Sequence, residues 1–337
     1  MRNIRVVFAV LSLSVVLVAG VADELQAQEK RQGWTKRLRY RRELRRELQG
    51  EIQLSGAFAL YPMAVKWAEE FRKIHPKVRI DISAGGAGKG ITDALAKVVD
   101  LGMVSRDIYP QELEKGAFPI AVVKDAVVPT INSNNPLIDQ ILATGLKQQV
   151  AQDLWIHTTA RTWGDVLGTG STIPVHVYTR SDACGAAETF AAWLGAKQED
   201  LEGTAVFGDP GVTSVVQRDK VGIGFNNIAY AYDINSKKPY RHIAVIPLDL
   251  NGNGKIDPEE DFYSSSMRLI TAIIKGQYPS PPARNLFLVG NGVPTKPEVI
   301  EFIKFILTDG QKYALGTGYI PLPKATVQQE LAKLKKN

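Results

Sequence analysis

The sequence predicts an α/β protein with two domains, and three observations support this. From Glu51 onward, strand-like runs alternate with runs that carry apolar residues at helical spacing. Three strand-like runs end in a loop of small residues directly before a helix. The chain has 337 residues, which is long for one domain and sufficient for two that each bury a core. A hydrophobic share of 45% and a charged share of 23% are those of an ordinary globular protein.

The elements follow from the hydrophobic periodicity. Helical spacing of apolar residues predicts helices, and short β-branched or alternating runs predict strands. The expected strands cover residues 52–54, 78–83, 100–105, 173–178 and 243–248. The expected helices cover residues 62–75, 90–99 and 188–194. In an α/β sheet, loops that follow the carboxyl ends of strands can converge on one ligand, and here these loops are residues 55–59, 84–90 and 180–186.

The third loop has the composition of an anion site. Arg180 offers a planar fork of donors, and Asp182 offers an acceptor suited to an anion that still carries a proton. The following helix adds unpaired N–H groups and the positive end of its dipole. The alternative interpretation is a surface Arg–Asp pair at a helix cap.

The second loop contains Gly88-Lys89 after further glycines, which resembles a nucleotide P-loop but fails two requirements. Ser83 stands where the first glycine is needed, and Gly90 follows Lys89 where a Ser or Thr would bind magnesium. A glycine-rich backbone nest for an oxyanion remains possible, and a structural tight turn is an equally open interpretation.

Residues 249–260 match the twelve-residue EF-hand loop at its diagnostic positions. Gly254 occupies the position of the sharp turn and Ile256 the apolar position of the loop. The loop is preceded by a strand-like run, whereas an EF-hand has a helix there. We therefore expect a structural calcium site, and the alternative is an empty polar turn. The candidate ligands are Asp249, Asn251, Asn253, Lys255, Asp257 and Glu260.

The net charge of +6 is concentrated near the N-terminus, where residues 29–47 carry nine Lys or Arg against three Glu. The rest of the chain is close to neutral, which argues against nucleic-acid binding. Residues 1–28 have the pattern of a signal peptide without a lipid-accepting cysteine, and an uncleaved N-terminal anchor is the alternative. Residues 29–48 are expected to form a basic tether or short exposed helix, with contact to anionic lipid headgroups as a secondary possibility.

The segments in their order resemble the phosphate-binding proteins of bacterial ABC importers. The matching segments are residues 55–62, 66–68, 85–90, 100–106, 179–185, 208–212, 221–225 and 316–322. The resemblance implies a type II periplasmic-binding-protein clamp, in which two domains of mixed sheet flanked by helices are joined by crossover hinge strands. It assigns residues 49–125 plus 240–323 to domain one and 126–239 to domain two, with a C-terminal tail at 324–337.

The resemblance also implies the anion contacts, position by position. They fall at Ala57, Phe58, Ala59, Ala87, Gly88, Ser105, Arg180, Asp182, Cys184, Gly185 and Ala186. Arg180 and Asp182 keep the family's residues. Hydroxyl residues common in the family are replaced at Ala57, Ala87, Cys184 and Ala186, and Ser105 stands where many members have an Asp. Backbone N–H groups and Arg106 are expected to compensate for the lost donors.

The implied function is capture of phosphate by an exported, monomeric protein that delivers it to an ABC permease in the inner membrane and catalyses no reaction. A carboxylate such as Asp182 favours protonated phosphate over sulfate, molybdate or tungstate. The alternatives are a binder of tungstate or molybdate, a periplasmic hydrolase that uses Cys184, and a calcium-stabilised scaffold. The chain has a single cysteine, Cys184, so it can form no internal disulfide. No His or Asn pattern in the sequence identifies a partner that would make Cys184 a nucleophile.

Overall fold

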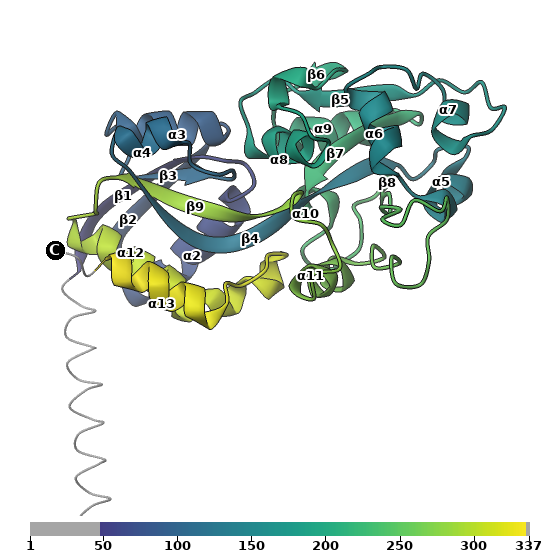
Figure 1. The fold of residues 1–337 in the computed structure, drawn as a ribbon. Coiled ribbons are helices and arrows are strands. Elements are labelled where there is room, and N and C mark those ends of the chain that lie inside the picture. Colours follow the sequence, from purple (N-terminus) through teal and green to yellow (C-terminus); the bar gives the residue numbers. More distant parts are fainter. Residues whose placement is uncertain (1–47, 335–337) are drawn as a thin grey trace, which may run out of the picture. The chain divides into compact units, whose positions relative to one another are not determined.

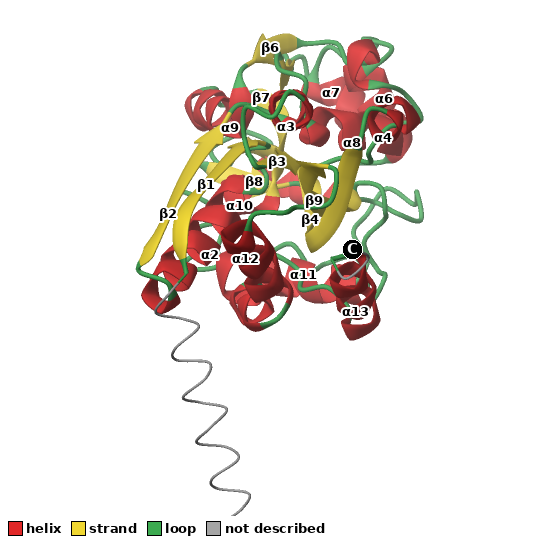
Figure 2. Ribbon diagram, turned by 90° about the vertical axis from the view of Figure 1, so that its left-hand side faces the viewer, coloured by secondary structure: helices red, strands yellow, loops and turns green. Residues whose placement is uncertain are grey.

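The computed structural model describes residues 48–334, and of these residues 50–334 belong to one compact unit. The expected signal peptide at 1–28 and the basic tether, apart from residue 48, lie outside the described residues. Strands and helices alternate along the described chain, and helices cover both faces of the sheet (Figure 2). The expected α/β class is therefore confirmed.

Nine strands form one sheet with the order β2-β1-β3-β9-β4-β7-β5-β6, and β8 pairs with β4 outside this path. The strands are β1 Gln49–Gly56, β2 Lys77–Ala84, β3 Leu101–Val104, β4 Ala117–Asn132, β5 His176–Arg180, β6 Thr204–Val206, β7 Gly222–Asn227, β8 Ile243–Val245 and β9 Ala283–Asn291. Parallel pairs join β1 to β3 and β5 to β6 and β7, whereas β4 runs antiparallel to β7, β8 and β9.

The helices follow the strands in chain order. The α-helices are α2 Tyr61–Ile74, α3 Ala87–Leu95, α4 Pro110–Glu114, α5 Ile138–Thr144, α6 Gln148–Trp155, α7 Trp163–Leu167, α8 Gly185–Trp193, α9 Gly208–Arg218, α10 Ile228–Ala231, α11 Ser266–Ile274, α12 Pro297–Leu307 and α13 Lys324–Lys333. The short 3-10 helices are η1 Gln198–Asp200, η2 Asp309–Tyr313 and η3 Leu315–Thr317.

The long strand β4 joins two lobes (Figure 1). Its residues 117–126 pair with β9 in the first lobe, and its residues 127–131 pair with β7 in the second. A second crossing lies beside it, because Val127 N donates to Pro282 O at 3.1 Å, directly before β9 begins. The structure thus has the two lobes and the crossover strands expected of the clamp.

Helix α2 shows why the first lobe folds as the pattern predicts. Pro62 lies in its first turn, where the missing N–H costs nothing. Met63, Trp67 and Phe71 repeat every four residues and are buried against the sheet. The Trp67 indole N–H also donates to Gly310 O at 3.0 Å, so this helix is bound to the C-terminal part of the chain.

Helix α3 begins at Ala87, three residues earlier than predicted. Gly86 takes φ 90°, which favours glycine and lets the chain turn from β2 into the helix. Gly90, inside the helix, lies so close to β3 that a Cβ would be 2.4 Å from Met103 O. The glycines of this loop therefore serve both the turn and the close approach of helix to strand.

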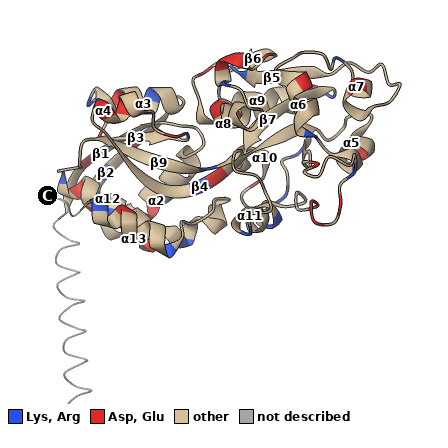
Figure 3. Ribbon diagram, in the orientation of Figure 1, with Lys and Arg blue, Asp and Glu red and all other residues tan. Residues whose placement is uncertain are grey.

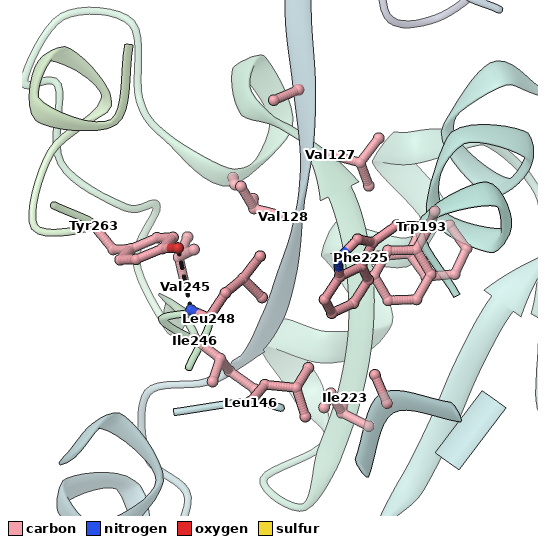
Figure 4. Close-up of a cluster of buried hydrophobic side chains, with 14 of the residues drawn as sticks. Val127, Val128, Leu146, Trp193, Ile223, Phe225, Val245, Ile246, Leu248 and Tyr263 are labelled. Atoms are coloured by element: carbon pink, nitrogen blue, oxygen red, sulfur yellow. Dashed lines mark hydrogen bonds between the residues drawn. The ribbon is translucent and has the colours of Figure 1, made fainter. Parts of the chain in front are cut away.

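The second lobe is built around a large apolar cluster (Figure 4). Phe190 of α8 stacks on Phe225 of β7 with ring centroids 4.5 Å apart, and Trp155 meets Phe190 edge-on at 5.0 Å. Leu248 and Tyr263 belong to the same cluster, and Leu248 N donates to the Tyr263 hydroxyl at 3.1 Å.

This packing corrects the expected domain boundary. The strand β8 pairs with the second half of β4, through Thr130 opposite Val245, and Leu269 and Ile270 of α11 join the second lobe's core. Residues 243–278 therefore belong to the second lobe, although the sequence assigned 240–323 as a block to the first domain. The chain returns to the first lobe only at β9.

The expected C-terminal tail also differs from the structure. Residues 324–333 form helix α13, which packs on α12 and on β4. The ammonium group of Lys333 donates to Pro119 O at 3.1 Å, and Glu330 is buried. The segment is part of the first lobe.

Basic and acidic residues are interspersed on both lobes (Figure 3). Within residues 48–334, no helix combines the length and the apolar character needed to cross a bilayer.

Candidate functional site

The three loops predicted to converge do so where the lobes meet. Gly85 N and Gly86 N donate to Gly56 O at 2.9 and 3.1 Å, which joins the first two loops. Gly88 N donates to Ala183 O at 3.1 Å, which joins them to the third loop across the lobes. Loops far apart in the sequence thus form one centre.

The contact between the lobes is tight at Gly185, the first residue of α8. A Cβ at this position would lie 2.0 Å from Ser105 O and 2.3 Å from Ser105 Oγ. Any larger residue would force the lobes apart, so Gly185 and Ser105 fix how closely the third loop approaches β3.

Arg180 is the buried cation of this centre. Its Nε and Nη2 donate to the two carboxylate oxygens of Asp182 at 2.8 and 2.6 Å, and its Nη1 donates to Asp209 Oδ2 at 2.7 Å. Desolvation lowers the pKa of Arg180, but Asp209, the Cys184 sulfur and Asp182 outweigh it and raise the net pKa. Three of five N–H donors are used, so two remain for a ligand.

Asp182 is neutralised by Arg180, and the pair is buried, unlike the surface pair of the alternative interpretation. Its Oδ1 also accepts from Gly208 N at 3.1 Å. Asp209, in the first turn of α9, accepts from Asn227 N and Nδ2 at 3.1 and 2.7 Å. Sequence reasoning missed Asp209 and Asn227, although the segment 208–212 was among those that carried the resemblance.

The first loop approaches Arg180 from the other lobe through Phe58. The Phe58 ring lies 5.8 Å from the Arg180 guanidinium carbon and meets Phe207 edge-on at 5.7 Å. Several of this loop's backbone groups already have partners. Ala57 N donates to Met103 O at 2.8 Å, and Ala59 O accepts from the Tyr319 hydroxyl at 2.7 Å.

Helix α8 presents its N-terminus to the centre. Cys184 is the N-cap residue, and its sulfur accepts from Ala187 N at 3.4 Å. Burial raises the pKa of the Cys184 thiol to about 12. The amides of Gly185 and Ala186 lie in the first turn, where N–H groups lack an acceptor within the helix. Ala87 is the first residue of α3, as Gly185 is of α8.

Arg106, the expected second cation, is already paired with a carboxylate and an aromatic ring. Its Nη1 and Nη2 donate to the Glu112 carboxylate at 2.9 and 2.7 Å, and its guanidinium lies 4.0 Å above the Tyr109 ring. Arg284, which the sequence analysis missed, takes the place beside Ser105, where its Nε donates to Ser105 O at 2.6 Å. A charged residue inside the apolar run of β9 was the signal that could have identified it.

We predict that Arg106→Gln leaves anion affinity within about twofold and lowers the free energy of unfolding by about 1–2 kcal/mol, because Glu112 loses a bidentate partner. Urea unfolding and ligand titration measure the two effects. Glu112→Gln is the matched control and is expected to behave alike. Binding that weakens tenfold in Arg106→Gln but not in the control would return Arg106 to the site.

The EF-hand-like loop is attached to the second lobe, where Ile256 N donates to Ala143 O at 2.8 Å. Asp249 accepts from Gly252 N and Gly254 N, both at 2.7 Å, and its side chain is fully buried. Glu260 Oε1 accepts from Leu250 N at 2.8 Å.

The remaining side chains of the loop bind one another. Asp257 accepts from the side-chain amides of Asn251 and Asn253 at 3.0 and 2.7 Å and pairs with Lys255 at 2.8 Å. Among residues 48–334, no group of three or more His, Cys, Asp or Glu is arranged to hold a metal. The carboxylate and amide oxygens are nevertheless the donors that calcium prefers.

Two α/β lobes joined by crossing strands, with a buried charged centre between them, define a two-lobed binding protein. A family model described as the PBP superfamily domain matches residues 43–309, and the chain belongs to this family.

The chain is similar over most of its length to the following proteins. Protein SphX of Synechococcus elongatus is 26% identical over 294 residues, covering 85% of this chain and 82% of that protein. Phosphate-binding protein PstS of Staphylococcus aureus is 24% identical over 299 residues, covering 86% and 84%. A Clostridium perfringens crystal structure, described as a phosphate ABC transporter substrate-binding protein with bound phosphate, has TM-score 0.66 and 22% identity and covers 81% of this chain and 100% of that one.

Proposed function

We propose that this protein captures phosphate between its two lobes and supplies it to an ABC importer. The observation that carries the proposal is the buried Arg180, held by Asp182 and Asp209 where the loops of both lobes meet. Two of its N–H donors remain for an oxyanion, next to the first turns of α3 and α8. The similarity to phosphate-binding protein PstS over most of the chain supports phosphate as the ligand.

The proposal includes export to the periplasm and delivery to a permease in the inner membrane. The signal-peptide pattern of residues 1–28 supports export. The two crossing segments support delivery, since a clamp that opens about a hinge can release its ligand to a partner. We propose a monomer that catalyses no reaction.

The state of Cys184 supports binding without chemistry. A nucleophilic cysteine reacts as its thiolate, and burial keeps the Cys184 thiol protonated at neutral pH. We therefore expect Cys184→Ser to retain phosphate binding, whereas a thiol hydrolase would lose its activity.

Equilibrium binding of radiolabelled phosphate to the full chain tests the proposed function. We expect saturable binding that unlabelled phosphate and arsenate displace and that sulfate and tungstate do not. Displacement by tungstate or molybdate at lower concentration than phosphate would identify another oxyanion as the ligand. Absence of binding to any of these anions would contradict the proposal and favour a scaffold.

We also propose that residues 249–260 bind calcium as a structural ion. The side chains of Asp249 and Glu260, the first and last residues of the loop, are buried and directed into it by backbone N–H groups. Asp257 would turn from Lys255 toward the ion, and Asn251 and Asn253 would supply oxygens.

We predict that about 1 mM calcium raises the free energy of unfolding by about 1–3 kcal/mol, since an ion that binds only the folded state stabilises it by mass action. Thermal unfolding with and without a chelator measures the shift. Glu260→Gln is expected to abolish it, while Glu259→Gln, which changes the exposed neighbour, should keep it. An equal calcium response in both variants would rule out this loop.

A further inference from the structure

Asp125 of β4 and Arg284 of β9 form a buried pair at the crossing between the lobes. They are direct partners in the antiparallel register, so their side chains share one face of the sheet. Asp125 is fully buried and Arg284 is 8% exposed. Figure 1 shows β4 and β9 side by side where the chain passes from one lobe to the other.

Arg284 contacts residues of the anion centre in both lobes. Its Nε donates to Ser105 O at 2.6 Å, next to the point where Gly185 approaches. Its Nη2 donates to Asn227 Oδ1. Asn227 in turn donates to Asp209, the carboxylate that binds Arg180. Arg284 is thus connected to Arg180 through hydrogen bonds of Asn227 and Asp209.

The same pair holds three buried polar atoms without a hydrogen bond of ordinary geometry. Within the described part of the chain, these atoms are Arg284 Nη1 and both carboxylate oxygens of Asp125. The backbone N–H groups of Ala126 and Ile228 act on Asp125 only by opposing the rise of its pKa. The closest approach between the two side chains is 3.9 Å, from Arg284 Nη2 to Asp125 Oδ2. Buried polar groups nearly always have partners, so these atoms point to a missing group that both accepts and donates.

We propose that Asp125 and Arg284 complete the anion site and select a protonated tetrahedral oxyanion. Arg284 Nη1 donates to an oxygen of the anion, and Asp125 accepts the proton of hydrogen phosphate or arsenate. This inference rests on the proposed function and extends it to ligand selection.

The charges favour the same class of ligand. Arg180 and Arg284 face three carboxylates, those of Asp125, Asp182 and Asp209. Sulfate, molybdate and tungstate carry no proton near neutral pH, so each would meet an ionised Asp125 as an unpaired like charge. Phosphate and arsenate can give Asp125 a hydrogen bond.

The Asp125→Asn variant tests this selection, with phosphate and sulfate affinities measured on the full chain. We expect phosphate affinity to fall at least tenfold and sulfate affinity to stay or rise, so that the ratio of the two falls at least tenfold. A merely structural role would change both affinities by the same factor. Asp81→Asn, on the more exposed surface of β2, is the control and should change neither.

Arg284→Lys and Arg284→Gln test the donor. We expect phosphate affinity to fall about tenfold in the lysine variant, which keeps the charge but not the fork, and at least 100-fold in the glutamine variant. Thermal unfolding without ligand checks that each variant folds. If the glutamine variant does not fold, the lysine variant and Asp125→Asn decide whether the pair takes part in anion binding.

Two outcomes would overturn the inference, and they are distinguishable. If the wild type binds phosphate but Asp125→Asn keeps its selectivity and Arg284→Lys its affinity, a bound water explains the unpaired atoms and the proposed function stands alone. If the wild type binds no phosphate, the proposed function fails and the inference fails with it.

Discussion

Replacing Arg180 with methionine is expected to weaken phosphate binding at least 100-fold and to lower the free energy of unfolding by about 3–5 kcal/mol. The loss of stability follows because Asp182 and Asp209 would remain buried without their shared cation. The loss of binding follows because two charge-assisted hydrogen bonds of about 1.5 kcal/mol each correspond to about 100-fold in affinity. Isothermal titration and urea unfolding measure the two effects.

Arg79→Met provides the comparison, because Arg79 pairs with Asp81 at the surface with 72% of its side chain exposed. We expect this change to alter stability by less than about 1 kcal/mol and to leave phosphate binding intact. An Arg180→Met protein that folds and binds phosphate with wild-type affinity would remove Arg180 from the site.

Asp125→Asn is expected to change how stability depends on pH in the ligand-free protein. Burial raises the pKa of Asp125 from its usual 3.8 to about 7, although Arg284 opposes the shift. The folded protein therefore binds the Asp125 proton more tightly than the unfolded chain does. Stability relative to the asparagine variant falls as pH rises from about 4 to about 7, by up to about 4 kcal/mol.

Urea unfolding of both proteins at several pH values between 4 and 8 measures this difference. The groups that act on Asp125 in the fold are Arg284, Asp209 and the backbone N–H groups of Ala126 and Ile228. The buried tyrosines Tyr230, Tyr278 and Tyr319 also interact with it and stay neutral in this range. A difference that is constant across the range would mean that Asp125 is ionised throughout.

The sequence was informative about local structure and about the loops. A β-branched run followed by small residues and a helical pattern locates a strand-to-helix turn, so Arg180, Asp182 and Gly88 could be placed in advance. Their convergence followed from the rule that such loops share one edge of a sheet. Neither inference needs knowledge of which distant strands pair.

The rest depended on tertiary pairing. Asp125 faces Arg284 only because of the register between β4 and β9, which no local pattern reports. Arg106 next to Ser105 was the nearest cation in sequence, but Glu112, six residues ahead in α4, binds it. In the same way, the strand-like run at 243–248 does not show that its partner is the second half of β4.

The place of β9 in the sheet has a consequence for the order in which the chain can fold during synthesis. In the first lobe, β3 and the first half of β4 are not neighbours and meet only through β9, which ends at Asn291. Domains generally fold as units as the chain emerges from the ribosome. The first lobe therefore cannot complete its sheet until nearly the whole chain has been made, whereas the strands of the second lobe are all available by Val245. Although its N-terminal strands are translated first, the first lobe is the last to close.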